Sequence, residues 1–155
     1  KLLDIGAYPG GWAQVTSKII TTGKILSLDI KKMDELKNVS FLQTDFLEEK
    51  TQDKIFNFFK DKLDVVISDM AANTTGNKSL DSIRTNQLCA EVVRFSTKIL
   101  KPNGVLVSKL FMGDDFVEVK ELAKSRFKKV EFFKPEASRN ESKETYLHCV
   151  TLRTL

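Results

Sequence analysis

Apolar runs alternate with helical patterns along this chain, and this alternation restricts the possible folds more than any other feature. Five runs rich in Val, Ile, Leu and Phe read as short strands: "KLLDI", "KILSLDI", "VSFLQTDF", "LDVVISDM" and "GVLVSKLF". Apolar residues recur at helical spacing in residues 11–20, 51–62, 81–100 and 114–127. Near-continuous apolar strands separated by helices are typical of a parallel sheet covered on both faces. The sequence therefore predicts a doubly wound α/β fold.

The end of the chain departs from this alternation. "KVEFFK" and "ETYLHCVTLRTL" both read as strands, yet only residues 135–143 separate them. That connection is too short for a crossover helix, so we expect the last strand to run antiparallel to its neighbours. Pro102-Asn103-Gly104 is predicted to form a turn before the fifth strand.

Composition indicates one globular domain without a membrane partner. The 155 residues are 41% hydrophobic and 30% charged, and no apolar run approaches the roughly 20 residues of a membrane helix. Cys89 and Cys149 have no metal-binding or pairing spacing, so we interpret both as buried reduced thiols in a cytosol-like compartment. The net charge of +4 and the pI of about 9.0 are compatible with a polyanionic partner.

The first strand leads into a glycine turn, Gly6-Ala7-Tyr8-Pro9-Gly10-Gly11, followed by a helix. In α/β sheets, ligands bind beyond the carboxyl ends of the strands, and glycine allows a close approach to the main chain. The dinucleotide fingerprint is not met because residue 8 is Tyr, and the P-loop lysine is absent. The turn therefore predicts a close ligand other than a pyrophosphate, or else a tight turn with no ligand.

Two acids follow the next strands. Asp29 ends the second strand, where a carboxylate commonly accepts hydrogen bonds from a ribose diol. Asp45 ends the third strand and is placed to meet the exocyclic amine of an adenine. Either acid alone is compatible with a surface or capping role, but together with the glycine turn they predict a nucleoside pocket.

Six segments resemble one known family. "DIGAYPGGW", "SLDI", "QTDF", "SDMAANTTG", "VSKLF" and "SKETY" are similar, in order and spacing, to the FtsJ-type ribosomal RNA ribose 2′-O-methyltransferases. The resemblance covers essentially the whole chain. It implies a Rossmann-like class I methyltransferase fold, with seven mostly parallel strands, the last one antiparallel, and helices on both faces. Two positions differ from the common family pattern: Tyr8, where alanine is frequent, and Ala72, where proline is usual.

The family places a Lys-Asp-Lys-Glu tetrad around the target hydroxyl. The resemblance assigns the aspartate to Asp69, the second lysine to Lys109 and the glutamate to Glu144. The family's first lysine lies upstream of the first strand and has no counterpart in this sequence. We therefore expect residues 1–155 to be a single methyltransferase domain that lacks a short N-terminal segment.

Strand topology leads to the same three residues. Asp69 and Lys109 lie at the ends of parallel strands, and Glu144 begins an antiparallel strand, so all three face one edge of the sheet. A structural ion network is the alternative interpretation, because a lysine within an apolar strand requires a charged partner or a catalytic role. In the catalytic interpretation, Lys109 is either the base that accepts the hydroxyl proton or the group that orients the hydroxyl.

The resemblance implies S-adenosylmethionine as cofactor, S-adenosylhomocysteine as product, and no metal. Its expected cofactor-binding residues are Gly6, Ala7, Pro9, Gly10, Gly11, Trp12, Asp29, Ile30, Asp45, Phe46 and Asp69. Basic side chains predicted to contact RNA phosphates are Lys134, Arg139, Lys143 and Arg84. The polar segment 73–84 is predicted to be a long lid or RNA-facing loop.

The leading hypothesis is 2′-O-methylation of a ribose, that of a uridine, in large-subunit ribosomal RNA. The alternatives are a transfer-RNA or messenger-RNA-cap ribose methyltransferase, and a catalytically silent module that binds S-adenosylmethionine or RNA. We expect a cytoplasmic monomer that acts on the large ribosomal subunit, with an organellar location as the alternative.

Overall fold

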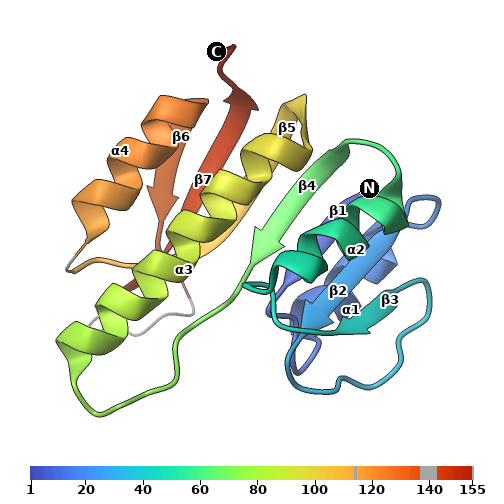
Figure 1. Ribbon diagram of the computed structural model, residues 1–155, viewed down its shortest axis with the longest axis horizontal. Coiled ribbons are helices and arrows are strands. Elements are labelled where there is room, and N and C mark those ends of the chain that lie inside the picture. The colour runs from blue at the N-terminus through green and yellow to red at the C-terminus, as the bar shows by residue number, and fades with distance from the viewer. Residues whose placement is uncertain (114, 137–142, 155) are drawn as a thin grey trace.

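The computed structural model describes residues 1–113, 115–136 and 143–154, which form one seven-stranded sheet with helices on both faces (Figure 1). The strands are β1 (Leu2–Ile5), β2 (Ile25–Asp29), β3 (Ser40–Gln43), β4 (Leu63–Ser68), β5 (Leu100–Phe111), β6 (Phe127–Phe133) and β7 (Glu144–Leu152). The helices are α1 (Gly11–Ile19), α2 (Glu49–Phe59), α3 (Lys78–Ile99) and α4 (Phe116–Arg126).

The strand order is β3-β2-β1-β4-β5-β7-β6. Neighbours from β3 to β5 pair in parallel, whereas β7 pairs antiparallel with both β5 and β6. The predicted α/β fold with an antiparallel last strand is therefore confirmed. Because β7 runs antiparallel to β5, its first residue, Glu144, lies opposite Phe111, at the edge of the sheet where β5 ends.

Apolar clusters on both faces attach the helices to the sheet. On one face, α2, α3 and α4 pack on the sheet (Figure 1). The rings of Phe59, Phe95 and Phe127 are fully buried there. On the other face, Trp12 of α1 packs against a smaller cluster around Leu2, Ile25 and Ile67. Burying one such side chain stabilises the fold by about 1.5–3 kcal/mol. Along β5 and β6 this second face is less covered, and its side chains remain half-buried or exposed.

The start of α3 and the predicted turn at residues 102–104 differ from the sequence prediction. Helix α3 begins at Lys78, because the Asn77 side chain caps it by accepting a hydrogen bond from the Leu80 N–H (3.1 Å). The prediction of a loop over residues 73–84 is therefore wrong from Lys78 onward. Residues 102–104 do not precede the fifth strand but interrupt β5, where the register shifts between the Leu63 and Val65 pairings with β4.

Both cysteines are free and buried, as the sequence predicts. Burial raises the pKa of the Cys89 thiol to about 11, which keeps it protonated. No helix in the described part of the chain has the length and apolar character needed to cross a bilayer.

Candidate active site

The packing of the protein's own side chains explains why the turn after β1 contains glycine. Gly6 has a φ of +72°, and a Cβ there would lie 2.6 Å from Cγ of Met70. Gly10 has a φ of +117°, and a Cβ there would approach Sδ of Met33 to 3.2 Å. A larger residue would be strained at both positions. The close approach that the sequence suggested is therefore made by two methionines and needs no ligand to explain it.

A cavity of about 410 Å³ lies beside this turn, at the carboxyl ends of β1, β2 and β4. Six of the residues predicted to bind cofactor line it: Gly6, Asp29, Ile30, Asp45, Phe46 and Asp69. Five others, Ala7, Pro9, Gly10, Gly11 and Trp12, lie outside this lining. Further lining residues that the sequence analysis did not assign include Tyr8, Leu28, Lys31, Thr44, Leu47, Met70, Ala71, Asn73 and Leu88.

Backbone amides hold the two acids of the cavity in place. The Asp29 carboxylate accepts the Tyr8 N–H through Oδ2 and the Lys31 N–H through Oδ1, both at 2.9 Å. Asp45 Oδ1 accepts the Leu47 N–H at 2.9 Å. Each carboxylate oxygen accepts about two hydrogen bonds, so both acids retain acceptor capacity toward the cavity. The acids are therefore oriented before any ligand arrives.

Apolar side chains form the walls between these acids. Tyr8, Ile30 and Leu47 are all exposed although they line the same cavity. Phe46 is buried beneath them and packs edge-on against Phe95 at 5.4 Å between ring centroids. An exposed apolar rim around oriented polar groups is typical of a small-molecule site.

Three charged side chains meet beside the cavity. Nζ of Lys109 lies 3.2 Å from Oδ1 of Asp69 and 3.6 Å from Oε2 of Glu144. The Lys109 side chain is only 13% exposed, while both carboxylates remain partly open to solvent. Asp69 lines the cavity and also belongs to this cluster. One carboxylate thus joins the small-molecule site to the cluster.

Tyr146 connects the two carboxylates of this cluster, and the sequence analysis did not assign it a role. Its hydroxyl donates to Oδ1 of Asp69 at 2.9 Å and lies 3.4 Å from Oε1 of Glu144. Burial, then the two negative charges, raise the pKa of this phenol well above its ordinary value of 10.0. The hydroxyl therefore stays neutral and remains a donor. Its position two residues after Glu144, on the same strand face, was the available sequence signal.

A further acid is buried beneath the site. Asp4 in β1 is completely buried; its Oδ2 accepts the Ser27 hydroxyl at 3.1 Å, and its Oδ1 has no hydrogen-bond partner. Burial raises the pKa of this carboxyl to about 7, and the charges of Asp69 and Asp29 add to the effect. Asp4 is therefore partly protonated near neutral pH.

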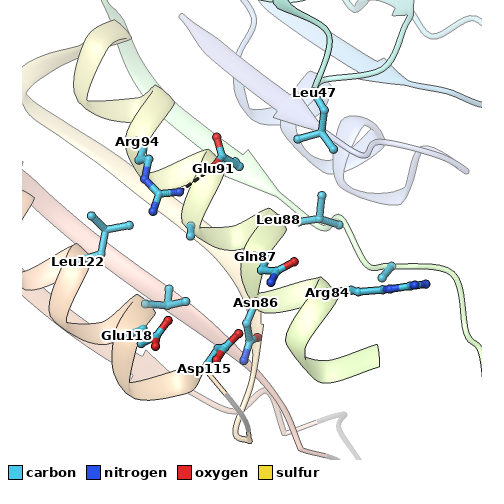
Figure 2. Close-up of a pocket in the computed structure, with 13 residues that line it drawn as sticks. Leu47, Arg84, Asn86, Gln87, Leu88, Glu91, Arg94, Asp115, Glu118 and Leu122 are labelled. Carbon is cyan, nitrogen blue, oxygen red and sulfur yellow. Dashed lines mark hydrogen bonds and ion pairs between the residues drawn. The ribbon is translucent and has the colours of Figure 1, made fainter. Parts of the chain in front are cut away.

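The residues predicted to contact RNA lie in different places. Lys134 follows β6, and Lys143 precedes β7, where its carbonyl accepts the Met112 N–H at 2.8 Å. Arg139 lies outside the described residues. Arg84 is on α3 and lines a second groove of about 600 Å³ between α3 and α4 (Figure 2). Leu47, Ala72 and Leu88 line both cavities, so the groove adjoins the first cavity.

Comparison with known proteins identifies the family of this chain. Residues 1–152 match the family model described as FtsJ-like methyltransferase. The chain belongs to this family. The ribosomal RNA large subunit methyltransferase E of Pelagibacter ubique is 45% identical to this methyltransferase over 152 residues, which cover 98% of this chain and 75% of that protein. The protein of the same name from Rickettsia akari is also 45% identical, over 95% of this chain and 67% of its own length.

Solved structures share the fold. A ribosomal RNA methyltransferase from Plasmodium falciparum superimposes with a TM-score of 0.84 at 28% identity, over 97% of this chain and 85% of that one. Human methyltransferase-like protein 13, solved in complex with S-adenosylhomocysteine, has a TM-score of 0.68 at 16% identity, over 97% of this chain and 71% of its own. At that identity the second likeness concerns the fold alone.

Proposed function

We propose that this FtsJ-like methyltransferase methylates a ribose 2′-hydroxyl, that of a uridine, in large-subunit ribosomal RNA, with S-adenosylmethionine as the methyl donor and S-adenosylhomocysteine as the product. The observation that carries this proposal is the double role of Asp69, which lines the cavity and pairs with Lys109. A methyl donor bound in the cavity and a ribose hydroxyl held at Lys109 would therefore meet beside one carboxylate. The names of the two bacterial relatives support the substrate class.

The residues of the cavity fit S-adenosylmethionine. Asp29 has the free acceptor capacity that a ribose diol requires, and Asp45 the capacity for an adenine amine. Ile30 and Leu47 supply exposed apolar surface for the faces of the base. Asp69 adds negative charge beside a cationic sulfonium. When bound, the cofactor supplies an activated methyl group. The protein therefore has to bind the cofactor, orient the ribose hydroxyl and provide for the loss of one proton.

Lys109 and its partners perform that task in our proposal. Asp69 and Glu144 hold the Lys109 side chain from two sides, and the neutral Tyr146 hydroxyl fixes the Asp69 oxygen that Lys109 contacts. A lysine held in this way either donates a hydrogen bond that orients the 2′-oxygen or, when neutral, accepts its proton. Precise positioning of reacting groups is worth about 7–11 kcal/mol in favourable cases.

Two measurements test the proposal. Calorimetry with S-adenosylmethionine should show binding, and large ribosomal subunits from cells that lack the enzyme should accept a labelled methyl group at a ribose. Transfer to transfer RNA or to a messenger-RNA cap alone would identify a different ribose methyltransferase. Cofactor binding without transfer to any RNA would identify a silent module. We further propose that the enzyme acts as a monomer, without a metal, in the cytoplasm or in an organelle with its own ribosomes.

A further inference from the structure

Lys109, Tyr146 and Phe133 form one row across three neighbouring strands. Tyr146 lies directly opposite Lys109 in the β5–β7 pair and directly opposite Phe133 in the β7–β6 pair. Side chains that lie opposite each other on antiparallel strands project from the same face of the sheet. Two strand spacings separate the ends of the row, which places Phe133 about 10 Å from Lys109. The row therefore leads from the charged cluster to the outer strand of the sheet.

The two aromatic members of this row are stacked. The rings of Phe133 and Tyr146 have centroids 5.7 Å apart and planes inclined by 24°, and Trp12 contacts the Tyr146 ring at 5.5 Å. Tyr146 is 8% exposed, whereas Phe133 is 47% exposed. The neighbouring Phe132 points to the opposite face and packs against Phe116. Phe133 thus rests on an aromatic support and presents the rest of its ring to solvent.

We propose that Phe133, supported by Tyr146, is the stacking surface for a base of the RNA strand that carries the reacting ribose. The inference rests on the RNA substrate proposed above. A base stacks on an aromatic ring whatever its sequence, and a ring in line with Lys109 would hold the strand while the ribose occupies the charged cluster. Lys134 directly follows Phe133 in the chain and Lys143 directly precedes Glu144, and both suit the phosphates of the same strand.

An RNA base suits this surface better than a protein partner. Among the described residues of β5, β6 and β7, Phe133 is the large apolar side chain that is exposed. The same face carries Lys129, which pairs with Glu131 at 3.3 Å, and His148, whose Nδ1 lies 3.5 Å from Glu131. A single ring among charged groups offers little area for burying a protein surface. It does offer what a nucleobase needs, a flat π-face with cations nearby.

The first experiment compares Phe133→Ala, Phe133→Leu and Phe133→Trp, with Val117→Ala as the control for loss of an exposed apolar side chain on α4. Each protein is titrated with a uridine oligonucleotide and with an abasic oligonucleotide of the same length. We expect Phe133→Ala and Phe133→Leu to weaken binding of the uridine oligonucleotide about 5- to 30-fold, with little change for the abasic one. Phe133→Trp should still bind the uridine oligonucleotide more tightly than the abasic one. Val117→Ala should bind both with the affinities of the parent protein.

The second experiment measures turnover on large ribosomal subunits and the melting temperature. Phe133→Ala should raise KM by a similar factor and leave the affinity for S-adenosylmethionine and the melting temperature unchanged. Equal losses for both oligonucleotides would show that the ring does not stack on a base, and a melting temperature lowered by several degrees would show a structural role; either result would overturn the inference. An unchanged Kd and KM would overturn it as well. If the parent protein discriminates between the oligonucleotides but methylates no subunits, the proposed substrate fails and the stacking surface stands.

Discussion

Replacing the buried acid Asp4 by asparagine should stabilise this protein at neutral pH. The carboxyl is completely buried, one of its oxygens lacks a hydrogen-bond partner, and burial raises its pKa to about 7. Asparagine has the shape of the protonated acid and cannot ionise. The substitution therefore removes the free-energy cost of an acid that the folded state holds protonated while the unfolded state releases its proton.

The magnitude follows from the two pKa values. In the unfolded chain Asp4 loses its proton near its ordinary value of 3.8, and in the folded protein it does so near 7. Because the pKa of Asp4 is raised in the folded protein, the contribution of this one carboxyl to the free energy of unfolding is greatest below pH 3.8. It falls by about 1.4 kcal/mol per pH unit between pH 3.8 and 7. The complete penalty is therefore about 4 kcal/mol above pH 7. Relative to the parent protein, Asp4→Asn should therefore gain about 4 kcal/mol of stability between pH 4 and pH 8.

Urea unfolding of both proteins at each pH from 4 to 8 checks this prediction, since the difference between them isolates the one group. Asp64→Asn is a control of opposite sign. The Lys101 ammonium, 2.8 Å away, lowers the pKa of Asp64 to about 2, so that substitution should cost stability by a nearly constant amount from pH 4 to 8 and lose its effect only as the pH falls below 3.8. A difference between Asp4→Asn and the parent that stays constant from pH 4 to 8 would refute the reasoning.

Three further substitutions test the site. Lys109→Arg should reduce methyl transfer at every pH if the lysine is the base, and full activity of this variant in a pH–rate profile would exclude that role. Asp29→Ala should raise the Kd of S-adenosylmethionine in calorimetry about 10- to 100-fold, because charge-assisted hydrogen bonds to the ligand are lost. Asn86→Ala should lower the free energy of unfolding by about 1–3 kcal/mol, because the buried amide exchanges two hydrogen bonds with the Phe111 main chain (2.8 and 3.0 Å) at the end of β5. Chemical denaturation measures that loss, and a parallel drop in kcat would show that the amide also positions Lys109, two residues earlier.

Much of the fold could be predicted because the relevant signals are local. Apolar runs such as "LDVVISDM" are long enough to identify buried strands, and the short connection after residue 134 requires an antiparallel return. The same topology places Asp69, Lys109 and Glu144 at one edge. Predictions failed where a single side chain decides a boundary. Asn77 starts α3 three residues earlier than the apolar pattern does, because a cap stabilises the backbone regardless of the periodicity that follows.

The role of the glycine turn was also beyond the sequence. Glycine shows only that something lies close to the main chain, and Met70 and Met33 were as possible as a ligand. The roles of Tyr146 and Phe133 depend equally on the neighbours that the sheet brings to them. The hydrogen-bond partner of a tyrosine in a strand cannot be predicted until the order of the strands is known.

The sequence by itself determined the class of fold, the edge of the sheet that carries the chemistry and the family to which the chain belongs. These depend on periodicity and on the order of motifs, which a linear chain contains in full. Only the tertiary structure decided that β7 lies between β5 and β6, that Tyr146 reaches Asp69, that Asp4 is isolated from water and that Phe133 is not. The burial and the contacts of a side chain depend on residues that are far apart in the chain, and these residues come together only when the sheet has formed.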